Sequence, residues 1–204
     1  MYHFKYVTKA EARKVREKLE NLVHEVQDEV RDNFTLQYYF IGSSARNMIT
    51  YDPATNIGFD FDVNLEVNYN EEQYLEKEIR QTLERAFQKV YGKYGYTHFE
   101  NSKRVFTIKL YDSQKKKIIH SCDIAIVNNF IDETGTAGQE YIAFDKKSTS
   151  YSWQQQSKSF NLKEKENWLR QQPEAWNAVR ERYLKKKNQN QNIHKHSRSL
   201  YAET

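Results

Sequence analysis

Apolar residues recur at two different periods along this chain, and the two periods separate helices from strands. A capping box formed by Thr8 and Glu11 opens a stretch with apolar residues at helical spacing, which predicts a long amphipathic helix ending near Asp32. The aromatic and apolar run 35–41 predicts a strand that ends at a Gly-Ser pair. We expect a short helix over 43–49 directly after it.

A second capping signal, Asn70 with Gln73, opens another predicted helix, whose apolar stripe reaches about Tyr91. Strict alternation of apolar and polar residues over 59–67 predicts a strand with one face in the core. Further strands are expected over 97–100, 104–111, 117–127 and 139–144. Lys103, Arg104 and Lys109 lie on or beside these strands and are interpreted as solvated strand edges. The alternative is that one of them binds a phosphate group.

The composition changes in the last third of the chain. Residues 145–161 are rich in Ser, Gln and Lys and are predicted to be a linker or flexible loop. This divides the chain into a core, residues 1–144 with the N-terminal helix, and a C-terminal helical segment, residues 162–204. In that segment Asn161 with Glu164 caps a short helix, and Pro173 begins another.

The end of the chain is polar and basic. The stretch from Lys185 to Arg198 is predicted to be a disordered tail, and the last residues, from Ser199 to Thr204, look like the start of a helix. We therefore expect that the chain is part of a longer protein with a further C-terminal domain.

Composition limits the class of protein. The chain has 204 residues, of which 38% are hydrophobic and 14% aromatic, enough for a packed core. Its net charge of +4 does not by itself imply a nucleic-acid partner. The single Cys122 fits a reducing compartment, and no apolar run has the length of a membrane span or signal peptide. We expect a cytoplasmic protein without a membrane partner.

Carboxylates provide the candidate chemistry. Asp60 and Asp62 are two positions apart on a predicted strand, so both side chains leave the same face. Asp123 is a single acid among small residues on one face of the predicted strand 117–127. If the two strands are neighbours, the three carboxylates converge, repel one another, and favour Mg²⁺ or Mn²⁺ as a counter-charge. The alternative is that Asp60 and Asp62 form the solvated face of an edge strand.

The Gly-Ser turn at Gly42 and Ser43 is the second candidate site. Glycine lets the backbone approach a phosphate closely, and the N–H groups of the following helix are free to donate. Ser43 and Ser44 offer hydroxyl groups, and Arg46 lies one turn into that helix, within reach of the same phosphates. The alternative is an ordinary strand-to-helix turn.

These residues, in this order, resemble the nucleotidyltransferase superfamily that includes DNA polymerase beta. Its signature of Gly-Ser, Asp-x-Asp and a later Asp is matched by Gly42, Ser43, Asp60, Asp62 and Asp123. The resemblance implies an α+β fold with a mixed β-sheet backed by helices and a short C-terminal helical appendage. It also implies two bound Mg²⁺ or Mn²⁺ ions. The long N-terminal helix and the trailing helices further resemble the branch of oligoadenylate synthetases and bacterial cyclic-oligonucleotide synthases.

The function implied is metal-dependent transfer of a nucleoside monophosphate from a nucleoside triphosphate, expected to be ATP, to a hydroxyl acceptor, with release of pyrophosphate. Asp60, Asp62 and Asp123 would be the catalytic and metal-binding residues. Gly42, Ser43, Ser44 and Arg46 would bind the nucleotide. The acceptor stays open between a nucleotide, RNA, a protein and an antibiotic. The alternative function is a catalytically silent nucleotide or RNA sensor of the same fold.

Overall fold

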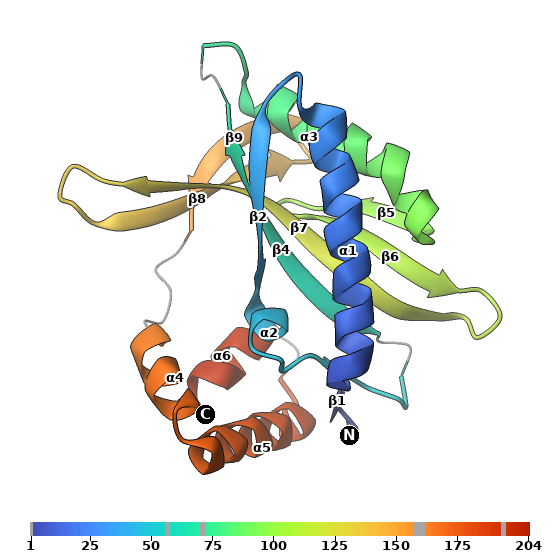
Figure 1. Cartoon of the computed structure of the whole chain (residues 1–204), viewed down its shortest axis with the longest axis vertical. Helices are drawn as coiled ribbons and strands as arrows, with labels where there is room; N and C mark the ends of the chain where they lie inside the picture. The colour runs from blue at the N-terminus through green and yellow to red at the C-terminus, as the bar shows by residue number, and fades with distance from the viewer. Residues whose placement is uncertain (1, 56–57, 70–71, 157–161, 193–194) are drawn as a thin grey trace.

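The computed structural model describes the chain except for residues 1, 56–57, 70–71, 157–161 and 193–194 (Figure 1). The helices are α1 Lys9–Val30, α2 Gly42–Ala45, α3 Glu76–Val90, the 3₁₀ helix η1 Tyr91–Tyr94, α4 Lys163–Arg170, α5 Pro173–Gln189 and α6 Ser197–Ala202. The strands are β1 Lys5–Tyr6, β2 Thr35–Ile41, β3 Thr50–Tyr51, β4 Phe59–Asn68, β5 His98–Asn101, β6 Phe106–Asp112, β7 Lys117–Ile131, β8 Ala137–Asp145 and β9 Ser150–Gln155.

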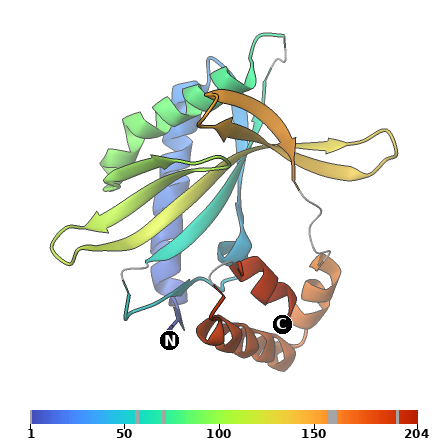
Figure 2. The same ribbon diagram turned by 180° about the vertical axis from the view of Figure 1, so that it is seen from behind.

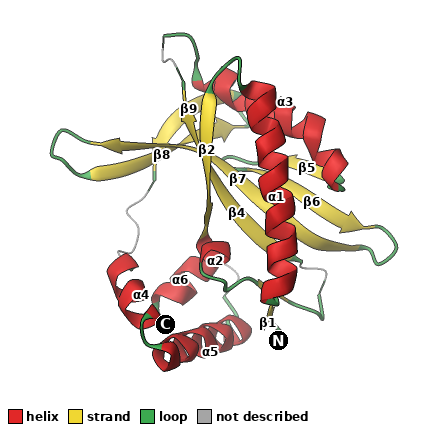
Figure 3. Ribbon diagram, in the orientation of Figure 1, coloured by secondary structure: helices red, strands yellow, loops and turns green. Residues whose placement is uncertain are grey.

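The main sheet is mixed. Its central path runs β2-β4-β7-β6-β5, β8 pairs with β7, and β9 pairs with β8. The β4 and β7 strands run parallel, and the other pairs in the sheet are antiparallel. Helices α1 and α3 lie across one face of the strands, as Figure 3 shows. The predicted α+β fold, a mixed sheet backed by helices, is confirmed.

The core lies between this face of the sheet and the two long helices. The apolar stripe of α1 buries Leu19, Leu22 and Val26, and the stripe of α3 buries its own apolar residues in the same cluster. From the sheet, the inward face of β4 and β7 contributes Phe61, Val63, Leu65, Ile124 and Ile126. The period-two pattern therefore turns the alternate residues of β4, including Asp60 and Asp62, away from the helices.

Two helix boundaries differ from the sequence prediction. The helix after the Gly-Ser pair ends at Ala45 instead of continuing to residue 49, because Asn47 takes a left-handed conformation with φ 55°. Helix α3 begins at Glu76 with Leu75 as the N-cap residue, whose N–H donates to the Glu78 carboxylate at 2.9 Å. The predicted cap at Asn70 lies outside the described residues.

The prediction of a linker or flexible loop over 145–161 is wrong for β9, which extends the sheet antiparallel to β8. Tyr151 and Trp153 alternate with polar residues on this strand and pack against the core. The composition, dominated by Ser and Gln, concealed this short period-two pattern. Residues 157–161, with the predicted cap at Asn161, lie outside the described residues, and the division of the chain into a core and a C-terminal segment stays a prediction.

The C-terminal helices gather at the end of the sheet where β2 runs into α2 (Figures 1 and 2). A second, small core joins them to the sheet: Met48, which follows α2, packs with Tyr183 of α5 and Leu200 of α6. The N-terminal strand also holds α5, because the Tyr6 hydroxyl donates to the Arg180 carbonyl at 2.7 Å.

The prediction of a disordered tail from Lys185 to Arg198 is wrong at both ends. Helix α5 continues to Gln189, and α6 begins at Ser197. The Asn188 side chain is fixed by the backbone of Phe4, whose N–H donates to Asn188 Oδ1 at 2.6 Å. Contacts with the N-terminal segment, distant in sequence, thus order residues whose own sequence is polar.

Arg80 of α3 binds the backbone of the turn between β5 and β6 and of β8. Its side chain is 1% exposed, and its guanidinium donates to the carbonyls of Ser102, at 2.8 Å, and Ile142, at 2.8 Å, and to the Asn101 side chain. Glu84 on the same helix supplies the counter-charge at 2.8 Å.

We expect Arg80→Met to lower the free energy of unfolding by about 3–5 kcal/mol, because several buried carbonyls and Glu84 would lose their donor. Urea unfolding followed by circular dichroism measures the loss. The matched control is Arg85→Met on the exposed side of the same helix, for which the change should stay within about 0.5 kcal/mol. An equal effect of the two substitutions would contradict this account.

Candidate active site

The three predicted carboxylates come together on neighbouring strands. In the parallel pairing of β4 with β7, Asp62 lies opposite Asp123, and Asp60 lies opposite Ser121. All three side chains leave the face of the sheet that α1 and α3 do not cover. The alternative of a solvated edge strand is wrong, because β4 is an interior strand between β2 and β7.

The surroundings of Asp60 and Asp62 raise the pKa of both carboxyl groups and so disfavour their charged forms. Burial, followed by the charges of Asp123 and Asp60, raises the pKa of Asp62 to about 6. Burial also raises the pKa of Asp60, although the Ser121 hydroxyl, which donates to this carboxylate, partly opposes the shift. Asp123 accepts a hydrogen bond from the Thr107 hydroxyl at 2.6 Å.

The three side chains offer the type of ligand atom that a hard divalent cation prefers. Three carboxylates supply oxygen ligands, and their repulsion is relieved by positive charge. Among the residues that the structure describes, no group of three or more His, Cys, Asp or Glu is placed so that it could hold a metal ion. The hydroxyl groups of Ser121 and Thr107 instead satisfy two of the carboxylates. Asp60, Asp62 and Asp123 are the residues that would hold such an ion.

The Gly-Ser turn lies directly against these carboxylates. Gly42 has φ 64°, and a Cβ atom at this position would come within 2.6 Å of Asp62 Oδ2. Antiparallel pairing of Ile41 with Asp62 fixes this approach. The turn therefore requires glycine for two reasons, its left-handed conformation and its contact with the carboxylate.

The four predicted nucleotide-binding residues do not all face the same surroundings. Gly42 and Ser43 line the cleft described below. Ser44 is buried, and its hydroxyl donates to the Ile41 carbonyl at 2.7 Å, so its side chain stabilises the turn from inside. Arg46 lines the cleft, but its guanidinium donates to the Gly42 carbonyl at 2.9 Å and to Glu166 at 3.0 Å.

A cleft of about 810 Å³ separates the sheet from the C-terminal helices, and the carboxylates and the turn lie along it. Its wall contains carboxylates and amides from the sheet, and basic and aromatic side chains from α5, α6 and the segment before α6. The residues around it are Ile41, Gly42, Ser43, Arg46, Met48, Ile49, Thr50, Asp60, Asp62, Asn64, Arg104, Asp123, Gln139, Gln156, Tyr183, Lys187, His196, Ser197, Arg198 and Tyr201. This volume is suited to a ligand of nucleotide size.

Lys187 is a cleft residue that the sequence analysis assigned to a disordered tail. Its ammonium group donates to the Thr50 hydroxyl and lies 4.4 Å from the ring centroid of Phe4. Burial lowers the pKa of Lys187, while the nearby charges of Asp60 and Asp62 act in the opposite direction. No local pattern signalled this position, because the stretch that follows Tyr183 is polar and basic.

Arg104 is a second basic residue of the cleft. Its guanidinium lies over the ring of Tyr141, 4.8 Å from the centroid, and its charge acts against the upward pKa shift of Asp62. Arg104 is exposed, as a solvated position should be, and it also lines the cleft. No pattern within the sequence places this turn residue there, because its contacts are with Tyr141 and with the distant Gln156.

Comparison with known proteins identifies the fold. No family model and no curated protein matches the chain. Among solved structures, the chain is similar to the STING-associated CdnE c-di-GMP synthase from Capnocytophaga granulosa, with a TM-score of 0.58 and 15% identity over 97% of this chain and 59% of the other. It is also similar to the di-nucleotide cyclase DncV of Vibrio cholerae, solved with GTP and 5MTHFGLU2, with a TM-score of 0.55 and 16% identity over 91% and 51% of the two chains.

The chain has the nucleotidyltransferase fold. A third structure with this fold, the CD-NTase CdnG of Bradyrhizobium diazoefficiens in complex with GTP, gives a TM-score of 0.50 at 15% identity over 86% of this chain and 42% of the other. The chain thus spans about half the length of the synthases it matches. The predicted resemblance to the nucleotidyltransferase superfamily and its bacterial cyclic-oligonucleotide synthases is confirmed at the level of fold.

None of the described helices has the length and apolar character needed to cross a membrane.

Magnesium is expected to stabilise this nucleotidyltransferase fold in a pH-dependent way. The raised pKa of Asp62, about 6, means that the folded state binds a proton that the unfolded state has already released. Without metal, the free energy of unfolding should therefore fall by up to about 3 kcal/mol as pH rises from about 4 through 6. Above pH 6 the ionised carboxylates are free to bind a cation.

We expect about 10 mM Mg²⁺ to raise the melting temperature at pH 7.5 by about 3 °C. At pH 5 the increase should be smaller, and in Asp62→Asn it should be absent. Differential scanning fluorimetry measures all three conditions. A wild-type melting temperature that does not respond to Mg²⁺ at pH 7.5 would contradict the assignment of these carboxylates as cation ligands.

Proposed function

We propose that the chain is a metal-dependent nucleotidyltransferase that transfers a nucleoside monophosphate from a nucleoside triphosphate to a hydroxyl acceptor and releases pyrophosphate. The observation that supports this most directly is the contact between the Gly42 turn and Asp62, on the same cleft as Asp60 and Asp123. In the proposed site, a turn that binds the donor phosphates would thus lie beside carboxylates that hold the cations, and this chemistry requires both.

The residues of the cleft would have two tasks, holding the cations and binding the phosphates. Asp60, Asp62 and Asp123 would hold two Mg²⁺ or Mn²⁺ ions, which when bound neutralise the phosphates and activate the acceptor hydroxyl. The Gly42 backbone and the Ser43 hydroxyl bind the β- and γ-phosphates. Lys187 on α5 interacts with the charges of Asp60 and Asp62 and adds a positive charge on the opposite wall of the cleft.

ATP is the donor that we propose first. The similar structures of CdnG and DncV are described as complexes with GTP, so GTP is the second donor to test. The acceptor hydroxyl belongs to a nucleotide, RNA or protein. We further propose that the protein acts in the cytoplasm.

The alternative is a catalytically silent sensor that binds nucleotide or RNA in the same cleft. The intact set of three carboxylates favours the enzyme, because a binding site for a polyanion gains nothing from three uncompensated negative charges.

The experiment that decides between them is incubation with each labelled nucleoside triphosphate and Mg²⁺ or Mn²⁺. Pyrophosphate is quantified, and products are resolved by mass spectrometry. Pyrophosphate together with a product that contains the nucleotide supports transfer and identifies the donor. Tight binding of triphosphate without any turnover, with and without added RNA, would favour the sensor.

A further inference from the structure

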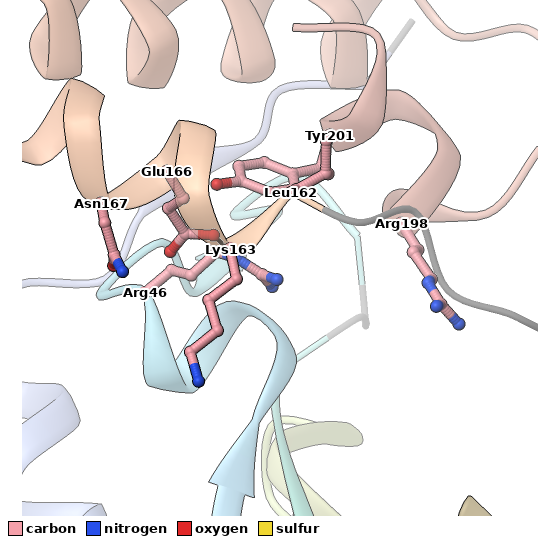
Figure 4. Close-up of a pocket in the computed structure, with 7 residues that line it drawn as sticks. All are labelled: Arg46, Leu162, Lys163, Glu166, Asn167, Arg198 and Tyr201. Atoms are coloured by element: carbon pink, nitrogen blue, oxygen red, sulfur yellow. Dashed lines mark hydrogen bonds and ion pairs between the residues drawn. The ribbon is translucent and has the colours of Figure 1, made fainter. Parts of the chain in front are cut away.

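A network of charged and aromatic side chains joins the Gly-Ser turn to the C-terminal helices. Glu166 on α4 accepts hydrogen bonds from two arginines on opposite sides, Arg46 at 3.0 Å and Arg170 at 2.8 Å. Figure 4 shows Arg46, Glu166 and Tyr201 facing one another from three different segments of the chain. They line a small pocket of about 290 Å³ beside the main cleft.

Each arginine of this network also packs on an aromatic ring. The guanidinium carbon of Arg46 lies 4.4 Å from the ring centroid of Tyr201 on α6, and that of Arg170 lies 4.1 Å from the ring centroid of Trp176 on α5. The side chain of Glu166 is 15% exposed and that of Arg46 is 29% exposed. The ion pair is thus partly shielded from water. A shielded ion pair is stronger than one at the fully exposed surface.

The same arginine controls the backbone of the turn. Arg46 Nη1 donates to the Gly42 carbonyl at 2.9 Å, while its Nε donates to Glu166. A planar guanidinium holds both acceptors in a fixed relation, which an ammonium group does not. A single side chain, that of Arg46, therefore links Glu166 on α4 to Gly42, the residue that lies against Asp62.

We propose that Arg46 and Glu166 form the joint by which the C-terminal helices position the Gly42 turn for triphosphate binding. Arg46 acts as a positioning residue in this joint, and Glu166, which itself contacts no phosphate, is its required partner. The inference rests on the proposed function and assigns a role to the C-terminal helices within it. It also replaces the sequence-based expectation that Arg46 is a direct ligand of the phosphates.

The sign of the effect of Glu166→Gln distinguishes the two roles of Arg46. If Arg46 binds phosphate directly, removing the competing carboxylate frees a cation and tightens triphosphate binding. If Arg46 positions the turn, loss of its partner weakens binding, by about tenfold if a partly buried ion pair of about 1.4 kcal/mol is lost.

The experiment measures the affinity of the full chain for a non-hydrolysable triphosphate and for the corresponding monophosphate, by calorimetry with Mg²⁺ present. We expect Glu166→Gln to weaken triphosphate binding about tenfold and monophosphate binding much less. Arg46→Met should give the same loss, and the double variant should lose no more than either single variant. Arg46→Lys should not rescue binding, because it cannot hold both acceptors.

The matched control is Glu164→Gln, an exposed acid on the same helix, which should leave both affinities unchanged. Tighter triphosphate binding by Glu166→Gln, or additive losses in the double variant, would overturn the inference. If the wild type binds no triphosphate, the proposed function fails instead, and the joint is then tested by melting temperatures. Non-additive changes for Arg46→Met and Glu166→Gln support the joint, and additive changes refute it.

Discussion

Asp62→Asn is expected to remove nucleotidyl transfer, lowering kcat by on the order of 10³-fold or more, while the fold stays intact. Asp62 lies between Asp60 and Asp123 and beside Gly42, so its carboxylate is central to the charge that would hold the cations. Asparagine keeps the shape of the side chain and removes the negative charge. Initial rates of pyrophosphate release at saturating triphosphate measure the effect.

Stability provides a second readout for the same substitution. Because burial and repulsion raise the pKa of Asp62 to about 6, removing its charge relieves the folded state at neutral pH. Without metal, the variant should therefore unfold at or above the wild-type temperature. The control is Glu66→Gln on the same face of β4, which does not line the cleft. Wild-type turnover by Asp62→Asn would refute the catalytic assignment.

Gly42→Ala is expected to lower kcat/KM for the triphosphate by about 100-fold. A side chain at φ 64° costs about 1–2 kcal/mol, and the new Cβ would meet Asp62 Oδ2 at 2.6 Å. Either the turn or the carboxylate must move, and each belongs to the proposed site. Steady-state kinetics with varied triphosphate, together with the melting temperature of the variant, measure the two consequences separately.

Gly92→Ala is the matched control for this substitution. Gly92 belongs to the 3₁₀ helix after α3 and does not line the cleft. A Cβ atom added at this position would have no other atom within 4 Å. Its kinetics should equal those of the wild type. If Gly42→Ala retained wild-type kcat/KM, the turn would have no role in binding the triphosphate.

Local patterns were sufficient for most of the fold. The capping box at Thr8 correctly begins α1, and the alternation of Phe59, Phe61 and Val63 correctly predicts β4. Such patterns succeed because burial on one face of an element imposes a period that is visible without any partner. They failed for β9, where only Tyr151 and Trp153 mark the period among polar residues, and for the helix after Ser43, which Asn47 ends early.

The residues of the candidate site likewise include some that local patterns predict and some that they do not. The carboxylates of β4 share a face by the geometry of a single strand, and the order Gly42, Asp60, Asp123 raised the expectation that they meet. Lys187 and Arg104 could not be assigned in this way. The approach of Lys187 depends on how α5 packs against the N-terminal strand, and that of Arg104 on its contact with Gln156. Both contacts join residues far apart in the chain.

The sequence by itself determined most of the helices and strands, the spacing of the acidic residues and the glycine turn, because each of these is set by residues within a few positions of one another. Only the tertiary structure decided that Asp123 lies opposite Asp62, that Gly42 touches that carboxylate, and that Arg46 is bound to Glu166. Those relations depend on strand register and helix docking. Both are fixed by the packing of the whole core, which no local pattern encodes.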